Sequence, residues 1–216
     1  MLKVSKYYAV AIGLLIAGCA PMDEKRKALE NSLAPEERAY LIGKFSTQCF
    51  SNSTKTKCTQ TFNLIDVHYK STNGDGFIDS LSSTHGGIRN NSIYDEIKPE
   101  FEEKSFYFCR VLPEGEYAFY DLRYWNFAGG GSGYSMKKAD HYNVSFNLKS
   151  QTVTNIDQLK VTTNQGLPGY LELRPLSEEE VQLALDKCPA EAKNKPLVNA
   201  QLWSKTYPSS FVKSVP

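Results

Sequence analysis

The residues best suited to catalysis are three histidines, His68, His85 and His141, and none has the spacing of a known catalytic motif. No two of them form the HExxH pattern that places two zinc ligands on one helix face. The glycine-rich stretch 130–134 (GGSGY) departs from the G-x-S-x-G nucleophile elbow at its last position, and no Lys-Ser/Thr pair follows it as a P-loop requires. We therefore predict no catalytic residue and no cofactor. The alternative is an envelope hydrolase that assembles His85 or His141 with a carboxylate and a nucleophile in space.

One stretch partly matches a calcium-binding loop. Residues 71–82 (STNGDGFIDSLS) supply Asn73, Asp75 and Asp79 as oxygen ligands, but Ser82 stands where the loop has a bidentate glutamate. No helical pattern flanks the stretch, and Asn-Gly and Asp-Gly pairs are typical of tight hairpin turns. We expect a hairpin turn and no metal site, and keep a calcium-dependent binding module as an alternative with these three ligands.

The N-terminus has the pattern of a secretory signal peptide over residues 1–18. Lys3 and Lys6 precede an apolar run over residues 7–16, followed by small residues. This run is too short to span a bilayer as a helix, which takes about 20 apolar residues.

The end of this segment, Ile16-Ala17-Gly18-Cys19, resembles the lipobox of bacterial lipoproteins. The resemblance implies that Cys19 becomes the acylated first residue of the mature chain and that the bilayer is its partner. Several acyl chains, palmitate among them, anchor stably where one does not. Asp after the cysteine favours inner-membrane retention in this family, so Ala20 favours the outer membrane of the cell envelope.

Acylation of Cys19 leaves four of the five cysteines. An even number outside the cytoplasm suggests two disulfides with three possible pairings, and free thiols are the alternative. We favour Cys49–Cys58, which closes a loop of hairpin size, and Cys109–Cys188. Loop entropy predicts about 2.7 and about 4.5 kcal/mol of stabilisation for these pairs.

Length and composition indicate one strand-rich domain. The chain has 216 residues, 13 of them Tyr and 11 Phe, and aromatic residues favour strands. Its formal charge is +1, and removal of Lys3 and Lys6 with the signal peptide changes this to −1. Such a balance does not favour nucleic acid as a partner. The many aromatic residues of the stretch 116–127 instead suggest a surface for an envelope protein or a glycan.

The pattern along the chain divides it into four parts. We predict a signal peptide over 1–18, a lipidated N-terminus and tether over 19–34, a β-sandwich domain with one helix over 35–190, and a tail over 191–216. The strands are expected at residues 38–46, 58–69, 106–112, 116–127, 141–149, 151–161 and 169–174, with 106–112 and 116–127 forming a hairpin. Ser177 and Glu180 form a capping box for a helix near 177–188, with Cys188 on its apolar face.

The stretch Leu112-Pro113-Glu114-Gly115-Glu116-Tyr117 resembles a strand-and-turn pattern of small bacterial lipoproteins whose function is unknown. Those proteins have a transthyretin-like (prealbumin-like) sandwich. The resemblance implies a mainly β, antiparallel sandwich of that type. Together with the lipobox, it predicts a membrane-anchored lipoprotein that acts as a non-catalytic structural or interaction module.

Overall fold

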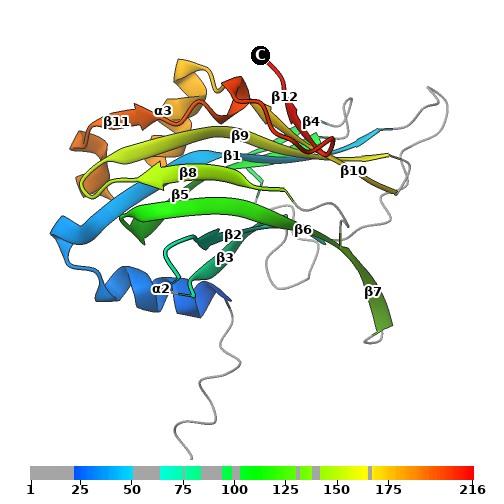
Figure 1. Ribbon diagram of the computed structural model, residues 1–216, viewed down its shortest axis with the longest axis horizontal. Helices are drawn as coiled ribbons and strands as arrows, with labels where there is room; N and C mark the ends of the chain where they lie inside the picture. Colours follow the sequence, from blue (N-terminus) through cyan, green and yellow to red (C-terminus); the bar gives the residue numbers. More distant parts are fainter. Residues whose placement is uncertain are drawn as a thin grey trace, which may run out of the picture.

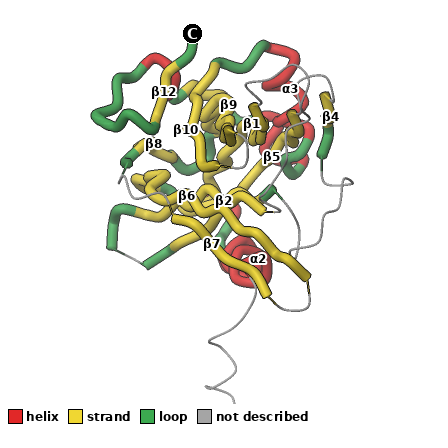
Figure 2. Tube along the Cα trace, turned by 90° about the vertical axis from the view of Figure 1, so that its right-hand side faces the viewer, coloured by secondary structure: helices red, strands yellow, loops and turns green. Residues whose placement is uncertain are grey.

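A computed structural model describes residues 22–50, 64–74, 76–83, 94–98, 103–129, 132–137, 142–164 and 167–216 of the chain. The signal peptide and the predictions for Cys19, Cys58, Asp75, His85 and His141 lie outside these residues. The described chain is mainly β. Its strands form two sheets that enclose the main hydrophobic core between them (Figures 1 and 2).

The larger sheet, sheet A, has the strand order β12-β10-β9-β1-β5-β4, and β11 pairs with β9. Its strands are β1 (Arg38–Phe50), β4 (Glu96–Lys98), β5 (Glu103–Pro113), β9 (Val153–Asn164), β10 (Leu167–Arg174), β11 (Leu197–Asn199) and β12 (Val212–Ser214). Sheet A is mixed. β1 and β11 run parallel to β9, and β12 runs parallel to β10, so the antiparallel arrangement that the sequence predicted holds in this sheet only for the pairs β1–β5, β4–β5 and β9–β10. Parallel neighbours need a long crossover, and here the chain forms all the described strands of the second sheet between β1 and β9.

The second sheet, sheet B, has the order β3-β2-β6-β7, and β8 also pairs with β6. Its strands are β2 (Leu64–Ser71), β3 (Ile78–Ser82), β6 (Gly115–Gly129), β7 (Ser132–Lys137) and β8 (Val144–Leu148). All its pairs are antiparallel, as expected. In β8 the residues alternate strictly between buried and exposed, which confirms the strand predicted over 141–149.

The hairpin predicted for β5 and β6 is wrong, because these strands belong to different sheets. The corner between them contains Pro113 and Gly115. A Cβ on Gly115, whose φ is 155°, would lie 2.8 Å from the side-chain Nδ2 of Asn73. The Tyr117 hydroxyl donates to the carbonyl of Pro113 at 2.9 Å and closes the corner. The turn therefore carries the chain from one sheet to the other.

The predicted C-terminal helix is confirmed as α3 (Glu178–Asp186), with Ser177 and Glu180 forming the capping box. It covers the face of sheet A turned away from sheet B, which we call the outer face (Figure 1). There Ala184 and Cys188 pack against Tyr40 and Ile42 of β1. A disulfide joins Cys188 to Cys109 on β5, as the sequence favoured. Cys49 is also disulfide-bonded, but its pairing with Cys58 stays a prediction.

A buried lysine connects α3 to sheet A. Lys44 of β1 is 2% exposed, and its ammonium lies 2.8 Å from Glu180 and 2.9 Å from Glu96. Burial lowers the pKa of Lys44, but the hydrogen bonds to the two carboxylates outweigh burial and raise it. Lys44 therefore stays charged and ties the start of α3 to β1 and β4.

The described part of the predicted tether, residues 22–34, and the predicted tail are both packed on the sandwich. α2 (Met22–Ser32) lies at the edge of the sandwich against β3 and β5, with Leu29 against the core and Arg26 3.6 Å from Asp79 (Figures 1 and 2). A short 3-10 turn, η1 (Pro35–Glu37), leads into β1.

After α3 the chain forms η4 (Ala190–Asn194), β11, η5 (Leu202–Ser204) and β12, and buries Leu202 and Phe211. The predicted boundaries near 35 and 190 therefore do not mark the ends of the packed structure. The apolar residues of the tether and the tail are too widely spaced to show a periodic pattern in the sequence.

Candidate functional site

The candidate site begins at an irregularity in the pairing of β1 and β9. Gly43 of β1 lies opposite two residues of β9, Ile156 and Asp157, which is the geometry of a β-bulge. Asp157 has φ 69°, in the left-handed region that non-glycine residues rarely adopt. A Cβ on Gly43 would lie 2.7 Å from the Asp157 carbonyl oxygen, so glycine is what lets the bulge fit.

The bulge changes which face each residue of β9 presents. Ile156 and Leu159 both lie in the core between the sheets, although they are three residues apart. In a regular strand such residues would point to opposite faces. Because the bulge adds one residue, Leu159 again points into the core. Asp157 is left on the outer face of sheet A.

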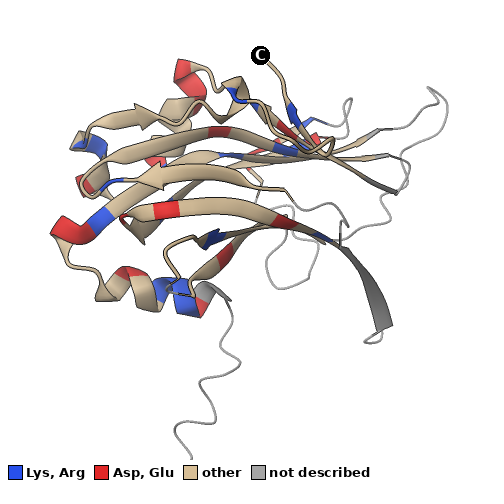
Figure 3. Cartoon of the chain, viewed as in Figure 1, with Lys and Arg blue, Asp and Glu red and all other residues tan. Residues whose placement is uncertain are grey.

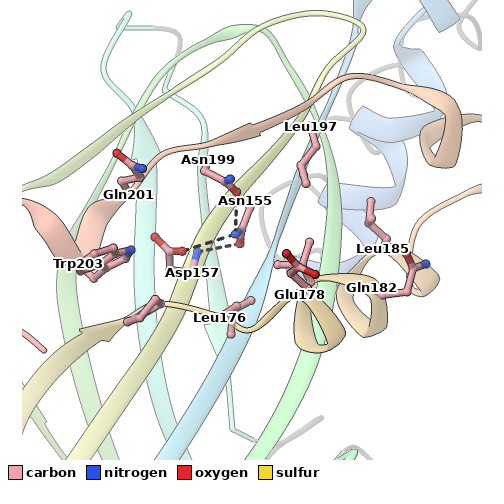
Figure 4. A pocket seen from close by; sticks show the side chains of 12 residues that line it. Asn155, Asp157, Leu176, Glu178, Gln182, Leu185, Leu197, Asn199, Gln201 and Trp203 are labelled. Carbon is pink, nitrogen blue, oxygen red and sulfur yellow. Dashed lines mark hydrogen bonds between the residues drawn. The ribbon is translucent and has the colours of Figure 1, made fainter. Parts of the chain in front are cut away.

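A cleft of about 520 Å³ opens on this face, between β9 and β11, η5 and α3 (Figure 4). Its volume lies in the range of small-molecule sites. One part of its lining is apolar and the other carries amides and carboxylates. The lining residues are Asn155, Asp157, Pro175, Leu176, Glu178, Val181, Gln182, Leu185, Leu197, Asn199, Gln201 and Trp203.

Asp157 holds the surrounding segments in place. Its carboxylate accepts the backbone N–H of Leu202 at 3.2 Å and that of Leu176, which ties η5 and the segment before α3 to the bulge. Asp157 is 4% exposed, and burial raises its pKa to about 6 although the two N–H groups lower it. A buried carboxylate with such a pKa is frequent at functional sites.

Asn155 connects the bulge to β11. Its side-chain oxygen accepts the N–H of Asp157 at 2.9 Å, and its side-chain nitrogen donates to the oxygen of Asn199 at 3.1 Å (Figure 4). Gln201, at the end of this segment, has φ 50°. Two non-glycine residues in left-handed conformations, Asp157 and Gln201, thus line one cleft. Such backbone strain clusters at functional sites.

This site was not predicted from the sequence, although β9 carries a signal for the bulge. Apolar residues stand at Ile156 and Leu159, with a spacing of three where a strand has two. Such a phase slip is typical of a bulge and draws attention to Asp157. Trp203 and Gln201 carry no comparable signal, because only the tertiary fold brings η5 beside β9.

Of the three predicted calcium ligands, the structure describes Asn73 and Asp79, and neither lines this cleft. Asp79 is 2% exposed, and its carboxylate accepts the hydroxyl of Tyr69 at 2.7 Å and pairs with Arg26. Asn73 lies beside Gly115 at the corner between the sheets. Within the described ranges, no group of three or more His, Cys, Asp or Glu side chains is placed to hold a metal ion.

His68, the histidine that the structure describes, lies on β2 near carboxylates. The hydroxyl of Ser82 donates to Asp66, and the indole N–H of Trp125 donates to the same carboxylate at 3.0 Å. Burial lowers the pKa of His68, and its Nε2 has no hydrogen-bond partner in the described part of the chain. An activated serine needs a hydrogen bond to its base, and Ser82 instead donates to Asp66.

Comparison with known proteins found no matching family model and no matching curated protein. Among solved structures, 61% of the chain is similar to a leucine-rich repeat protein from Bacteroides thetaiotaomicron, with 12% sequence identity and a TM-score of 0.33. The chain spans 15% of the length of that protein. This likeness is too low to bear on fold or function. Neither α2 nor α3, the helices of the described residues, is long and apolar enough to cross a membrane.

The raised pKa of Asp157 predicts a pH dependence of stability. The pKa is about 6 in the folded chain and about 3.9 unfolded, so between these values the folded state binds the extra proton. Stability contributed by this group should fall as pH rises from about 4 to about 6, and then level off. In Asp157→Asn this part of the pH profile should disappear, as measured by urea unfolding at each pH.

The exposed Asp186 provides the matched control, because its hydrogen bond to Lys193 lowers its pKa. Asp186→Asn should remove a contribution of the opposite sign that is lost as pH falls. If Asp157→Asn keeps the wild-type profile between pH 4 and 6, Asp157 does not titrate as described.

Proposed function

We propose that this protein is a lipid-anchored lipoprotein of the cell envelope whose sandwich is a non-catalytic binding module, with the cleft on sheet A as its binding site. The bulge at Asp157 is the observation that carries the proposal. A left-handed aspartate is costly, and the cleft-lining segments are hydrogen-bonded to it. Strain of this kind persists only where the surrounding structure enforces it, and it clusters at active and binding sites.

The anchor in this proposal rests on the lipobox. Acylated Cys19 would insert its chains into the bilayer, with the outer membrane favoured by Ala20. Only Ala20 and Pro21 separate Cys19 from α2, which packs on the sandwich. The folded domain would therefore lie close to the membrane surface.

The finer fold assignment, a transthyretin-like sandwich, is also part of this proposal. It is supported by the two stacked sheets and by the Pro113–Gly115 corner with the Tyr117 hydroxyl bond, which forms in the stretch that carries the resemblance. The parallel pair β1 and β9 is a feature that the resemblance did not imply.

The charge distribution supports a partner such as an envelope protein or a glycan rather than a nucleic acid. Acidic and basic residues are interspersed along the described ribbon in the view of Figure 3. A nucleic-acid partner would require a continuous basic patch.

The anchor is tested by Cys19→Ser. We expect loss of metabolic acyl labelling and release of the protein from membranes, because the thiol that carries the lipid is gone. Ala20→Asp is the matched control, and it should keep the acyl label while moving the protein towards the inner membrane. A Cys19→Ser protein that still labels and sediments with membranes contradicts the anchor.

The cleft is tested by photocross-linking in the native cell envelope. A photoreactive residue in place of Gln182, which lines the cleft, should give a discrete cross-linked product. The same residue in place of Glu179, exposed on the same helix but outside the cleft, should not. Equal products from both positions, or none from Gln182, would exclude the cleft as the binding site.

A further inference from the structure

We propose that the cleft binds a neutral saccharide, with a sugar ring stacked on Trp203 and its hydroxyl groups bound by Glu178, Asn199 and Gln201. This inference rests on the proposed binding function and names its ligand class. Four properties of the cleft support it: the charge of its lining, its free hydrogen-bonding groups, its aromatic surface and the hydrogen bonds that Asp157 already accepts.

The charge of the lining disfavours anionic ligands. Among the described residues, two carboxylates, Asp157 and Glu178, line the cleft, and no lysine, arginine or histidine does. A phosphate or carboxylate ligand would meet repulsion and would find no cationic partner. Nucleotides, acidic sugars and phospholipid headgroups are therefore disfavoured.

Several polar groups of the cleft are available to a ligand. In the described structure, the carboxylate of Glu178, the side-chain amide of Gln201 and the side-chain nitrogen of Asn199 have no hydrogen-bond partner. They combine donors with acceptors. A sugar hydroxyl both donates and accepts, so it satisfies either kind, whereas an apolar ligand would leave these groups without partners.

Trp203 supplies the apolar surface for a sugar ring. It is half-buried, packs against the main core and also lines the cleft beside Asp157 (Figure 4). Its indole N–H has no partner among the described residues. A ring held by packing offers a rigid face for the C–H groups of a sugar and a polar edge for a hydroxyl.

The hydrogen bonds that Asp157 already accepts argue against a cationic ligand. Its carboxylate already accepts the N–H groups of Leu202 and Leu176. Of the described lining residues, Glu178 is then the carboxylate that stays available, and it is exposed, so its attraction for an ammonium group is weakened by water. Amides outnumber free carboxylates here, which suits hydroxyl groups better than a cation.

The test is calorimetric titration of the full-length protein in detergent. The probes are neutral hexasaccharides of glucose (α- and β-linked), mannose, xylose and N-acetylglucosamine, with oligogalacturonate as the anionic and a glucosamine oligomer as the cationic comparison. We expect at least one neutral oligosaccharide to bind with a Kd of about 1 mM or tighter. Absence of binding by every neutral probe at about 10 mM, or equal binding of the anionic oligomer, overturns the inference.

Variants then assign the binding to the cleft. Trp203→Ala should weaken binding by about tenfold or more. Trp203→Phe keeps an aromatic ring against the core and should weaken it less, which covers the case in which the alanine variant fails to fold. Glu178→Gln should weaken binding, whereas Glu179→Gln, one residue along the same helix turn and outside the cleft, should not. Wild-type affinity in both Trp203→Phe and Glu178→Gln contradicts the assignment.

The cross-linking experiment distinguishes failure of the cleft as a binding site from failure of the saccharide as its ligand. A product from position 182 without binding of any neutral saccharide would overturn the ligand class and keep the cleft as a binding site. No product and no saccharide binding would overturn both.

Discussion

The candidate site depends on one extra residue in β9. Because Gly43 has no side chain, the carbonyl of Asp157 can approach β1, and two residues fit opposite one. The bulge keeps Leu159 in the core and turns Asp157 towards the outer face, where its carboxylate holds Leu202 and Leu176. Core packing and site geometry thus follow from the same local irregularity.

The opposite wall of the cleft, α3, is held at both ends. Near its start, Glu180 completes the capping box with Ser177 and also binds the ammonium of Lys44. Beyond its end, Cys188 is covalently joined to Cys109 of β5. Because both attachments connect to the central strands of sheet A, the helix has little freedom to move relative to the bulge. A cleft with walls held in this way is preorganised for a ligand.

Local patterns in the sequence predicted the elements that local interactions determine. The alternation around Val144 and Phe146 and the capping box at Ser177 each indicated an element that the structure has. The sheet switch at Pro113 was not predictable in this way, because a Pro-x-Gly turn suits a hairpin equally well. The parallel pairing of β1 with β9 depends on contacts between residues more than 100 positions apart along the chain, on the order of half its length, and no local pattern reports them.

The candidate site could likewise be predicted from the sequence only in part. The spacing of Ile156 and Leu159 contains the bulge signal, but Glu178, Asn199 and Trp203 come from three separate elements. Only the folded chain brings them together.

The most direct test of the bulge is amide hydrogen exchange of a variant in which Asp157 is deleted. Without this residue, Ile156 and Leu159 become alternate residues of a regular strand, so the sandwich should remain folded. We expect the amides of Leu202 and Leu176 to exchange much faster than in the wild type, because they lose their acceptor, while β1 and β5 keep their protection. Wild-type protection at Leu202 and Leu176, or a loss of protection that extends equally through β1, would contradict the account.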